Sequence, residues 1–185
     1  MGRLIYSTLA SLDGYIADRD GGFDWAVPRD DLHEAINARM HGVGTFLLGR
    51  RLFEVMRAWD TFDLDGQPAV VTEFARIWRA ADKVVYSRTL QHVDAPRTRL
   101  ERHFAVEEVR RFVASAGRDV AIGGPDLAGP AFRAGIVDDV LLHVFPVLVG
   151  GGTAAFPDVR LDLELVEERR FEGGVVRLAY RRAGD

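Results

Sequence analysis

Short apolar, β-prone runs alternate along this chain with segments whose apolar residues recur at helical spacing. The first run, residues 4–9, is followed after a glycine-containing loop by residues 30–40, where apolar side chains fall on one helical face. The same alternation predicts strands at residues 45–48, 84–86, 120–122 and 139–145, and helices around residues 52–59, 70–78, 105–116 and after Pro125. Strands that alternate with helices are typical of an α/β fold with a parallel sheet.

The C-terminal part of the chain departs from this alternation. Residues 161–171 and 175–180 have the composition of strands and are separated only by Glu172, Gly173 and Gly174, which predicts an antiparallel hairpin. The expected sheet is therefore mixed, mostly parallel with an antiparallel C-terminal edge. No repeat or low-complexity linker interrupts the sequence, so we expect a single domain over residues 1–185.

The composition argues against several classes of function. The chain has no cysteine and no HExxH motif, so we expect no disulfide, no thiol nucleophile and no metal. A net charge of -4 argues against a nucleic acid partner, because nucleic acid phosphates require a basic face. No window approaches the roughly 18 apolar residues of a membrane span, and the N-terminal stretch is too short and polar for a signal peptide. We therefore expect a cytoplasmic protein without a membrane partner.

Three predicted strands end in residues that suit an anion, and the first of these ends is Gly49-Arg50-Arg51. In an open α/β sheet, ligands bind beyond the carboxyl ends of the strands, where helix N-termini present free N–H groups. Two arginines in the first turn of a helix oppose its macrodipole by about 0.3–1 kcal/mol each, which a bound phosphate would offset. The alternative is that the arginines extend into solvent or pair with carboxylates such as Glu54.

The other two ends carry different chemistry. Ser87 and Arg88 place a hydroxyl beside a guanidinium, which suits a phosphate or a ribose, although Ser-Arg turns are common on surfaces. The third end runs directly from a short strand into Gly123 and Gly124 and then into a helix. Consecutive glycines let a ligand approach the main chain closely. The alternative for this segment is a plain tight turn.

Five segments together resemble one superfamily. They are ASLDGYIA at residues 10–17, LLGRR at 47–51, YSR at 86–88, IGGPDL at 122–127 and HVFPVLVGGGTAAFPD at 143–158. In order and spacing, over residues 3–182, the chain resembles the dihydrofolate reductase-like superfamily. Within it, the chain is most similar to the C-terminal reductase domain of the bifunctional riboflavin-biosynthesis deaminase/reductase.

The resemblance implies a three-layer α/β/α fold, NADPH as hydride donor and a homodimer, for which Phe156 and the C-terminal hairpin could supply the interface. It implies that Gly49, Arg50 and Arg51 hold the cofactor's phosphates and that Ser87 and Arg88 bind the adenosine 2′-phosphate. It also implies a pyrophosphate turn with a cis peptide between its two glycines, and a first loop that covers the nicotinamide. The residues of that turn are Ile122, Gly123, Gly124, Pro125, Asp126 and Leu127, and those of the loop are Ala10 and Ile16.

At the substrate end, the resemblance places Asp13, Trp25, Asp30 and Asp31 beside the nicotinamide. Trp25, Pro28 and the aspartates are similar to the segment that carries the pterin-binding carboxylate in true dihydrofolate reductases. Asp30 fits that carboxylate by spacing, and Asp31 fits it by the leucine that follows. We expect Asp13 and Asp30 to be catalytic and Trp25 and Asp31 to bind the substrate, since such a carboxylate could bind an aminopyrimidine edge or supply a proton. The alternative is that both aspartates cap a helix.

The resulting expectation is an NADPH-dependent oxidoreductase for a small molecule. The acceptor would be a pyrimidine ribosylamine or a related heterocycle, as in 5-amino-6-(5-phosphoribosylamino)uracil reductases. The sequence predicts a polar, acidic loop at residues 60–68, where those enzymes carry a phosphate-reading segment, and this difference argues against a phosphoribosyl substrate. The alternatives are a dihydrofolate or pterin reductase and a non-catalytic, nucleotide-binding dimeric module.

Overall fold

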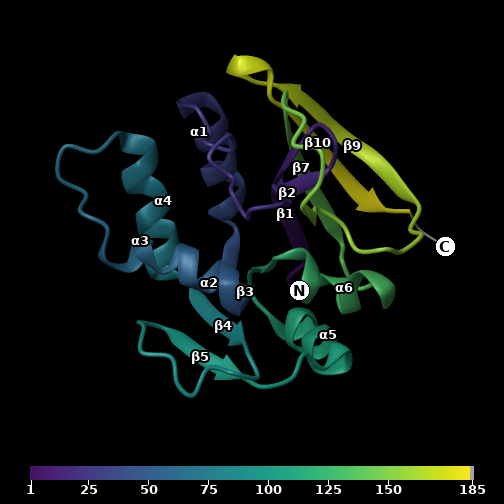
Figure 1. Cartoon of the computed structure of the whole chain (residues 1–185). Coiled ribbons are helices and arrows are strands. Elements are labelled where there is room, and N and C mark those ends of the chain that lie inside the picture. Colours follow the sequence, from purple (N-terminus) through teal and green to yellow (C-terminus); the bar gives the residue numbers. More distant parts are fainter. Residues whose placement is uncertain (184–185) are drawn as a thin grey trace.

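The computed structural model describes residues 1–183 and is built around one eight-stranded sheet with the order β5-β4-β3-β6-β1-β7-β10-β9 (Figure 1). The strands are β1 (Leu4–Ser11), β3 (Val43–Gly49), β4 (Asp82–Tyr86), β5 (Thr98–Glu101), β6 (Asp119–Gly123), β7 (Asp139–Phe145), β9 (Leu163–Arg170) and β10 (Val176–Arg182). From β5 to β7 every neighbouring pair is parallel. Because β10 is antiparallel to both β7 and β9, the predicted mixed sheet with its C-terminal hairpin is confirmed.

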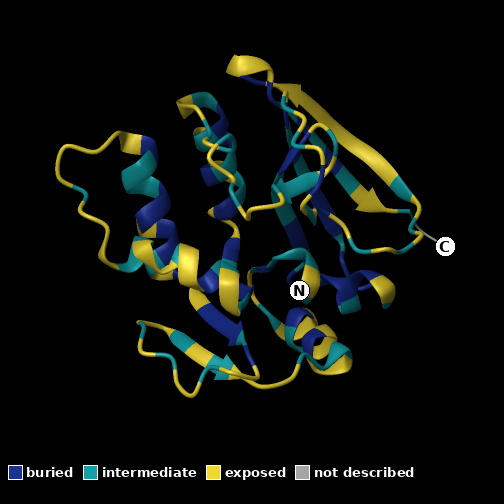
Figure 2. Cartoon of the chain, in the orientation of Figure 1, coloured by how far each residue is buried: buried dark blue, intermediate teal, exposed yellow. Residues whose placement is uncertain are grey.

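Helices cover both faces of this sheet. They are α1 (Asp30–Met40), α2 (Arg50–Met56), α3 (Ala58–Thr61), α4 (Ala69–Ala80), α5 (Val106–Ser115) and α6 (Pro125–Arg133). Figure 1 shows α1, α2 and α4 on one side and α5 and α6 on the other. Successive β1 residues alternate between the layers: Leu4 and Tyr6 pack in the cluster with α5 and α6, and Ile5 packs in the cluster with α1 and α4. The central strands are therefore buried on both faces (Figure 2), as in a three-layer α/β/α fold.

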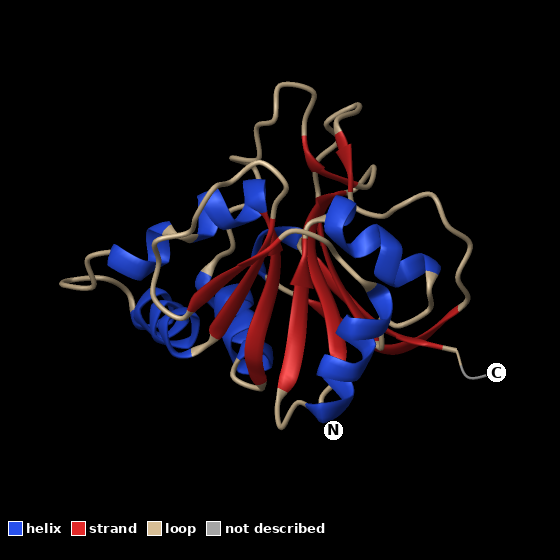
Figure 3. Ribbon diagram, turned by 90° about the horizontal axis from the view of Figure 1, so that it is seen from below, coloured by secondary structure: helices blue, strands red, loops and turns tan. Residues whose placement is uncertain are grey.

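Three short strands were absent from the sequence prediction. They are β5 and a separate antiparallel pair formed by β2 (Tyr15–Ala17) and β8 (Thr153–Ala154). The small pair stands above the edge at which the parallel strands end (Figure 3). Strands of two to four residues are too short to show a periodic pattern, and β2 and β8 form only because two distant loops meet. No helix among residues 1–183 is long and apolar enough to span a bilayer.

The segment predicted as an acidic loop at residues 60–68 begins differently, because Asp60 and Thr61 belong to α3. Asp60 is held there by a buried polar network. Its Oδ1 accepts a hydrogen bond from Trp78 Nε1 at 2.8 Å and lies 3.8 Å from Nζ of Lys83, whose side chain has no exposed surface. Nζ also donates to the Trp78 carbonyl at 3.2 Å. Burial lowers the pKa of Lys83, and Asp60 opposes this shift.

We predict that Asp60→Ala lowers the free energy of unfolding by about 3–5 kcal/mol, because it leaves the Lys83 ammonium buried without its carboxylate. Chemical denaturation measures this difference. Asp65→Ala is the matched control: Asp65 is exposed in the same segment, and its replacement should change stability by less than about 0.5 kcal/mol. Equal stabilities for the two variants would show that Asp60 does not neutralise Lys83.

Candidate functional site

The three strand ends predicted to bind an anion lie side by side. β3 pairs with β4 and β6, so Gly49 is aligned with Tyr86 and Leu48 is aligned with Gly123. Because all three strands run parallel, the residues that follow them emerge at one edge of the sheet. The structure thus brings together the Gly49, Ser87 and Gly123 segments, which are separated by more than 30 residues in sequence.

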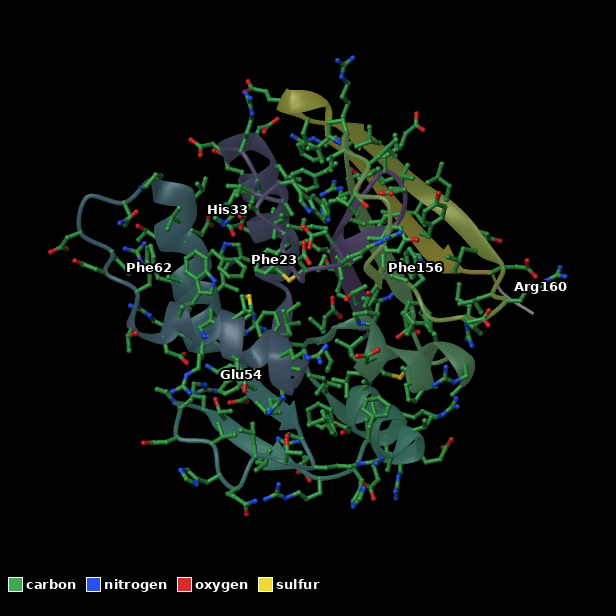
Figure 4. The ribbon with its side chains drawn as sticks, in the orientation of Figure 1. Phe23, His33, Glu54, Phe62, Phe156 and Arg160 are labelled. Atoms are coloured by element: carbon green, nitrogen blue, oxygen red, sulfur yellow. The ribbon has the colours of Figure 1, made fainter. Side chains whose placement is uncertain are left out.

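At the first end, α2 starts directly after Gly49 without a side-chain cap. Arg50 Nε lies 3.8 Å from Glu54 Oε1, four residues further along α2 (Figure 4), so the predicted alternative pairing exists for Arg50. Both side chains are about half exposed, and such surface pairs contribute little stability. Arg51 is exposed and has no ion-pair partner within residues 1–183. Both guanidinium groups are therefore available to an anion at the start of α2.

At the second end, the Ser87 hydroxyl shapes the chain itself. Ser87 is buried, and its Oγ accepts hydrogen bonds from the N–H groups of Thr89 at 3.2 Å and Leu90 at 3.1 Å. Arg88, by contrast, is exposed. Sequence reasoning missed Arg102, which follows β5 and donates to the carbonyls of Ser87 at 3.2 Å and Gln91 at 3.0 Å, and also to that of Leu90. Ser87 and Arg102 together fix the loop that presents Arg88.

A cavity of about 190 Å³ lies beside this loop, on the α5 side of the sheet. Its lining residues are Tyr86, Arg99, Glu101, His103, Ala105, Glu108, Val109 and Phe112. Burial raises the pKa of Tyr86 to about 12, so its hydroxyl stays neutral at pH 7. No sequence motif indicated this cavity, because β5 and α5 form it by tertiary packing.

At the third end, the two glycines serve different purposes. A Cβ on Gly123 would overlap Cδ2 of Leu52, so this glycine lets α2 pack against β6. Gly124 has a φ of +88° and is the N-cap of α6, and a Cβ there would meet no atom within 4 Å. The cis peptide expected between the two glycines is absent, and no cis peptide occurs within the described residues. The positive φ of Gly124 provides the sharp turn instead.

The first turn of α6 lies close to that of α2, since a Cβ on Gly49 would be 3.9 Å from Cβ of Leu127. Pro125 is in the first turn of α6, the helix has no side-chain cap, and Asp126 is exposed. The side chain of Ile122 is buried in the core, so only its main chain can face a ligand. Two uncapped helix N-termini therefore face the same edge of the sheet.

Of the residues expected near the nicotinamide, Ala10 is buried at the end of β1 and Ile16 is half-buried in β2. Asp13 follows β1, and its carboxylate is already engaged. Oδ1 accepts hydrogen bonds from Ser11 Oγ at 2.6 Å and Val149 N at 3.2 Å, and Oδ2 accepts one from Gly150 N at 2.7 Å. These donors, the Ser11 hydroxyl foremost, lower the pKa of Asp13. Asp13 thus joins two loops at the edge of the sheet.

The substrate-end residues lie around the start of α1. Trp25 packs edge-to-face on Phe145, with ring centroids 6.0 Å apart, and its buried Nε1 has no hydrogen-bond partner within residues 1–183. Asp31 Oδ1 accepts a hydrogen bond from Leu32 N at 2.8 Å, and its Oδ2 accepts one from Glu172 N at 2.8 Å, which ties α1 to the turn before β10. Asp30 is exposed, and its carboxylate has no hydrogen bond within the described residues. Of the aspartates at positions 13, 30 and 31, Asp30 is therefore the one whose carboxylate has no hydrogen bond within the described residues.

Two histidines near the site, His33 and His143, pack within the fold. His33 points from α1 toward α4 (Figure 4), where its ring centroid lies 5.8 Å from that of Phe74. His143 in β7 is buried, and its Nδ1 lies 3.2 Å from the carbonyl of Thr8. Burial lowers the pKa of His143 to about 4, so the ring is neutral at pH 7. Residues 1–183 contain no cluster of three or more histidine, aspartate or glutamate side chains that could hold a metal ion.

The amino-acid sequence is similar to those of two curated proteins. The chain is 29% identical over 181 residues to the uncharacterized protein YyaP of Bacillus subtilis, covering 96% of this chain and 94% of YyaP. It is 31% identical over 155 residues to the riboflavin biosynthesis protein RibD of Mycobacterium tuberculosis, covering 80% of this chain and 43% of RibD. This chain therefore matches less than half of the length of that RibD.

Solved structures establish the fold class. The diaminohydroxyphosphoribosylaminopyrimidine deaminase/5-amino-6-(5-phosphoribosylamino)uracil reductase of Thermotoga maritima has a TM-score of 0.69 at 16% identity, over 98% of this chain and 57% of that chain. Dihydrofolate reductase from Enterococcus faecalis has a TM-score of 0.64 at 16% identity, over 99% of this chain and 98% of that chain. The predicted dihydrofolate reductase-like fold is thus confirmed.

The family of the chain follows from a match that spans nearly all of these elements. Residues 3–177 match the family model described as the RibD C-terminal domain. The matched residues run from the start of β1 into β10. The match includes all three strand ends and the loops that surround them. The chain belongs to the RibD C-terminal domain family.

Proposed function

We propose that this protein is an NADPH-dependent reductase that transfers a hydride to a nitrogen heterocycle such as a pyrimidine ribosylamine. The observation that carries the proposal is that β4, β3 and β6 end side by side. At this edge lie the uncapped N-termini of α2 and α6 and the exposed arginines Arg51 and Arg88. Main-chain N–H groups at helix N-termini and guanidinium groups both bind phosphates. Membership in a family that includes a riboflavin biosynthesis protein supports reductase chemistry for the site.

The residues present fit a dinucleotide phosphate. The space above Gly124 is open, so a diphosphate can approach the main chain there and reach the first turn of α6. Arg51 is exposed at the start of α2 and would pair with the same anion, and Arg88, exposed beyond β4, would pair with the 2′-phosphate. The cavity next to Tyr86 could receive the adenine at this end. NADPH, when bound, supplies the hydride.

At the other end of the site, the protein orients the acceptor and delivers a proton. Ala10 and Ile16 would exclude water around the transferring hydride. The reduced acceptor takes up one proton, and we assign its delivery to Asp30, directly or through a water molecule. Asp30 takes this role because the oxygens of Asp13 and Asp31 are engaged by main-chain N–H groups.

A second candidate is a dihydrofolate or pterin reductase. Its support is the spacing of Trp25, Pro28 and Asp30, together with the buried Trp25 Nε1, which has no hydrogen-bond partner among the described residues. The acidic residues 63 and 65 also favour an acceptor without a phosphoribosyl group. Oxidation of NADPH with dihydrofolate and with an aminopyrimidine ribosylamine, each assayed separately, distinguishes the two candidates. NADPH binding without reduction of any acceptor would favour the alternative of a non-catalytic, nucleotide-binding module.

The homodimer stays a prediction. Phe156 packs on Tyr6 and Phe132 with centroid distances of 5.8 and 6.0 Å, yet it keeps 37% of its surface exposed. The edge strand β9 is exposed over most of its length (Figure 2), including Leu165 and Val166. Light scattering of the purified protein would measure its oligomeric state.

We predict that Arg88→Ala weakens NADPH binding about 10- to 100-fold, because a charge-assisted contact to the 2′-phosphate is lost. Binding of NADH, which lacks that phosphate, should stay within about twofold of the wild-type value. Calorimetric titration with both nucleotides measures the difference. Arg76→Ala serves as the control, since Arg76 is exposed on α4, away from the strand ends. An equal loss of affinity for both nucleotides would show that Arg88 does not contact the 2′-phosphate.

We predict that Gly124→Val abolishes NADPH binding while the protein remains folded. The side chain would fill the approach to α6, and valine is strained at a φ of +88°. Gly66→Val is the matched control for strain, because Gly66 has a φ of +71° and is equally open. Circular dichroism checks the fold and titration checks the affinity. Wild-type affinity in Gly124→Val would exclude this turn from the site.

We predict that Asp30→Asn lowers kcat about 100-fold and leaves the Kd for NADPH unchanged, since the carboxylate acts on the acceptor's proton. Asp31→Asn is the comparison variant and should alter stability more than kcat. Steady-state kinetics with the acceptor that the wild-type enzyme reduces would measure both effects. An unaffected kcat in Asp30→Asn would assign the proton delivery to another group.

A further inference from the structure

Two loops that are more than 130 residues apart in sequence form one structural unit at the edge of the sheet. They leave the neighbouring strands β1 and β7, whose ends are aligned at Ser11 and Phe145. Leu12 N donates to the Val147 carbonyl at 2.8 Å, and Ala155 N donates to the Gly14 carbonyl at 2.8 Å. Together with the β2–β8 pair, these bonds join residues 12–19 to residues 147–155, and we call the unit the clasp.

Asp13 is the charged centre of the clasp. Its carboxylate accepts hydrogen bonds from two main-chain N–H groups of the opposite loop, those of Val149 at 3.2 Å and Gly150 at 2.7 Å. The Ser11 hydroxyl donates to the same carboxylate, and its oxygen accepts a bond from Tyr15 N at 3.0 Å. An ionised carboxylate accepts at both oxygens, whereas an amide accepts only at one. Replacement by asparagine should therefore release part of the opposite loop.

The glycines of the HVFPVLVGGG segment form the other half of the clasp. Gly152 has a φ of +135°, and a Cβ there would overlap the main chain of Ala17 and Asp18. Gly151 has a φ of +139°, and its Cβ would lie 2.7 Å from Arg19 Nε. Arg19 Nη2 in turn donates to the Gly150 carbonyl at 2.9 Å. At Gly152 the main chain lies directly on the main chain of the opposite loop, so only glycine fits there.

The clasp borders the proposed cofactor site. Thr153 and Ala154 of β8 line a cavity of about 320 Å³ together with Pro125 and Asp126 from the first turn of α6. Phe156, which follows β8, lines the same cavity (Figure 4). On the β2 side, Ile16 lies between Tyr15 and Ala17, the two residues paired with β8. The position of Ile16 therefore depends on the loop that Asp13 holds.

From these contacts we infer that Asp13 is a positioning residue. Its carboxylate locks the glycine loop after β7 to the loop after β1, and so fixes Ile16 in β2 and holds β8 beside the start of α6. This inference rests on the proposed function for the identity of the bound molecule, NADPH. It replaces the catalytic role expected for Asp13 from the sequence, because a carboxylate engaged by loop donors is not free to act on an acceptor.

The test compares Asp13→Asn with Asp20→Asn, a matched control in the same loop whose exposed side chain makes no hydrogen bond within the described residues. Hydrogen exchange without any ligand should accelerate about tenfold or more at Val149 and Gly150 in Asp13→Asn and stay unchanged in the control. NADPH affinity should fall about 3- to 10-fold, a modest loss because the phosphate contacts remain. A second variant, Gly152→Ala, opens the clasp without touching Asp13 and should produce the same two changes.

Three results would overturn the inference. One is wild-type exchange at Val149 and Gly150 in Asp13→Asn. Another is faster exchange with unchanged NADPH affinity, which would make the clasp irrelevant to the site. A third is a loss of turnover with wild-type exchange and wild-type affinity, which would mark Asp13 as a catalytic residue. If wild-type protein binds no NADPH, the proposed function fails, and the ligand-free exchange experiment still decides whether Asp13 holds the clasp.

Discussion

The parallel pairing of β3 with β4 on one side and β6 on the other is the constraint on which the rest of the structure depends. It makes three strands end at one edge of the sheet. The residues that follow these strands are each a weak signal of anion binding, but together they form one surface. Gly49 and Gly124 open two helices there, and Arg51 and Arg88 add positive charge beside them. A strand shifted out of this order would separate the helix N-termini and leave no place for an extended anionic ligand.

Polar contacts from distant parts of the chain hold the loops at this edge. Arg102 holds the loop that presents Arg88, Asp31 holds α1 against the turn before β10, and Asp13 holds the glycine loop after β7. In each case a charged side chain bonds to main-chain groups, which gives stronger bonds than neutral partners would. The loops thereby keep a defined geometry although they contain little regular structure, as a binding site requires.

Much of this fold could be predicted from the sequence, because its core strands and helices are long enough to show their periods. The bounds of α1 and β7 agree with the expected residues 30–40 and 139–145, and the three strand ends that the sequence singled out lie side by side. The missed features depend on tertiary contacts. β2 and β8 form only when two remote loops meet, Arg102 acts on a loop 11 to 15 residues away, and no local pattern marks the cavity beside Tyr86.

The roles of the aspartates and the turn before α6 also depend on the three-dimensional structure and not on a local sequence pattern. The resemblance placed Asp13, Asp30 and Asp31 together at the substrate end, but only the hydrogen-bond partners seen in the structure separate their roles. The cis peptide implied by the resemblance is absent between Gly123 and Gly124, and Gly124 has a φ of +88°.

The central claim is that the edge formed by β4, β3 and β6 binds a 2′-phosphorylated dinucleotide. Calorimetric titration of the purified wild-type protein with NADPH, and separately with NADH, tests it most directly. We predict saturable binding of NADPH with one molecule per chain and an affinity at least about tenfold higher than that for NADH. Equal affinities would contradict the role of Arg88, and no binding of either nucleotide would contradict the proposed function.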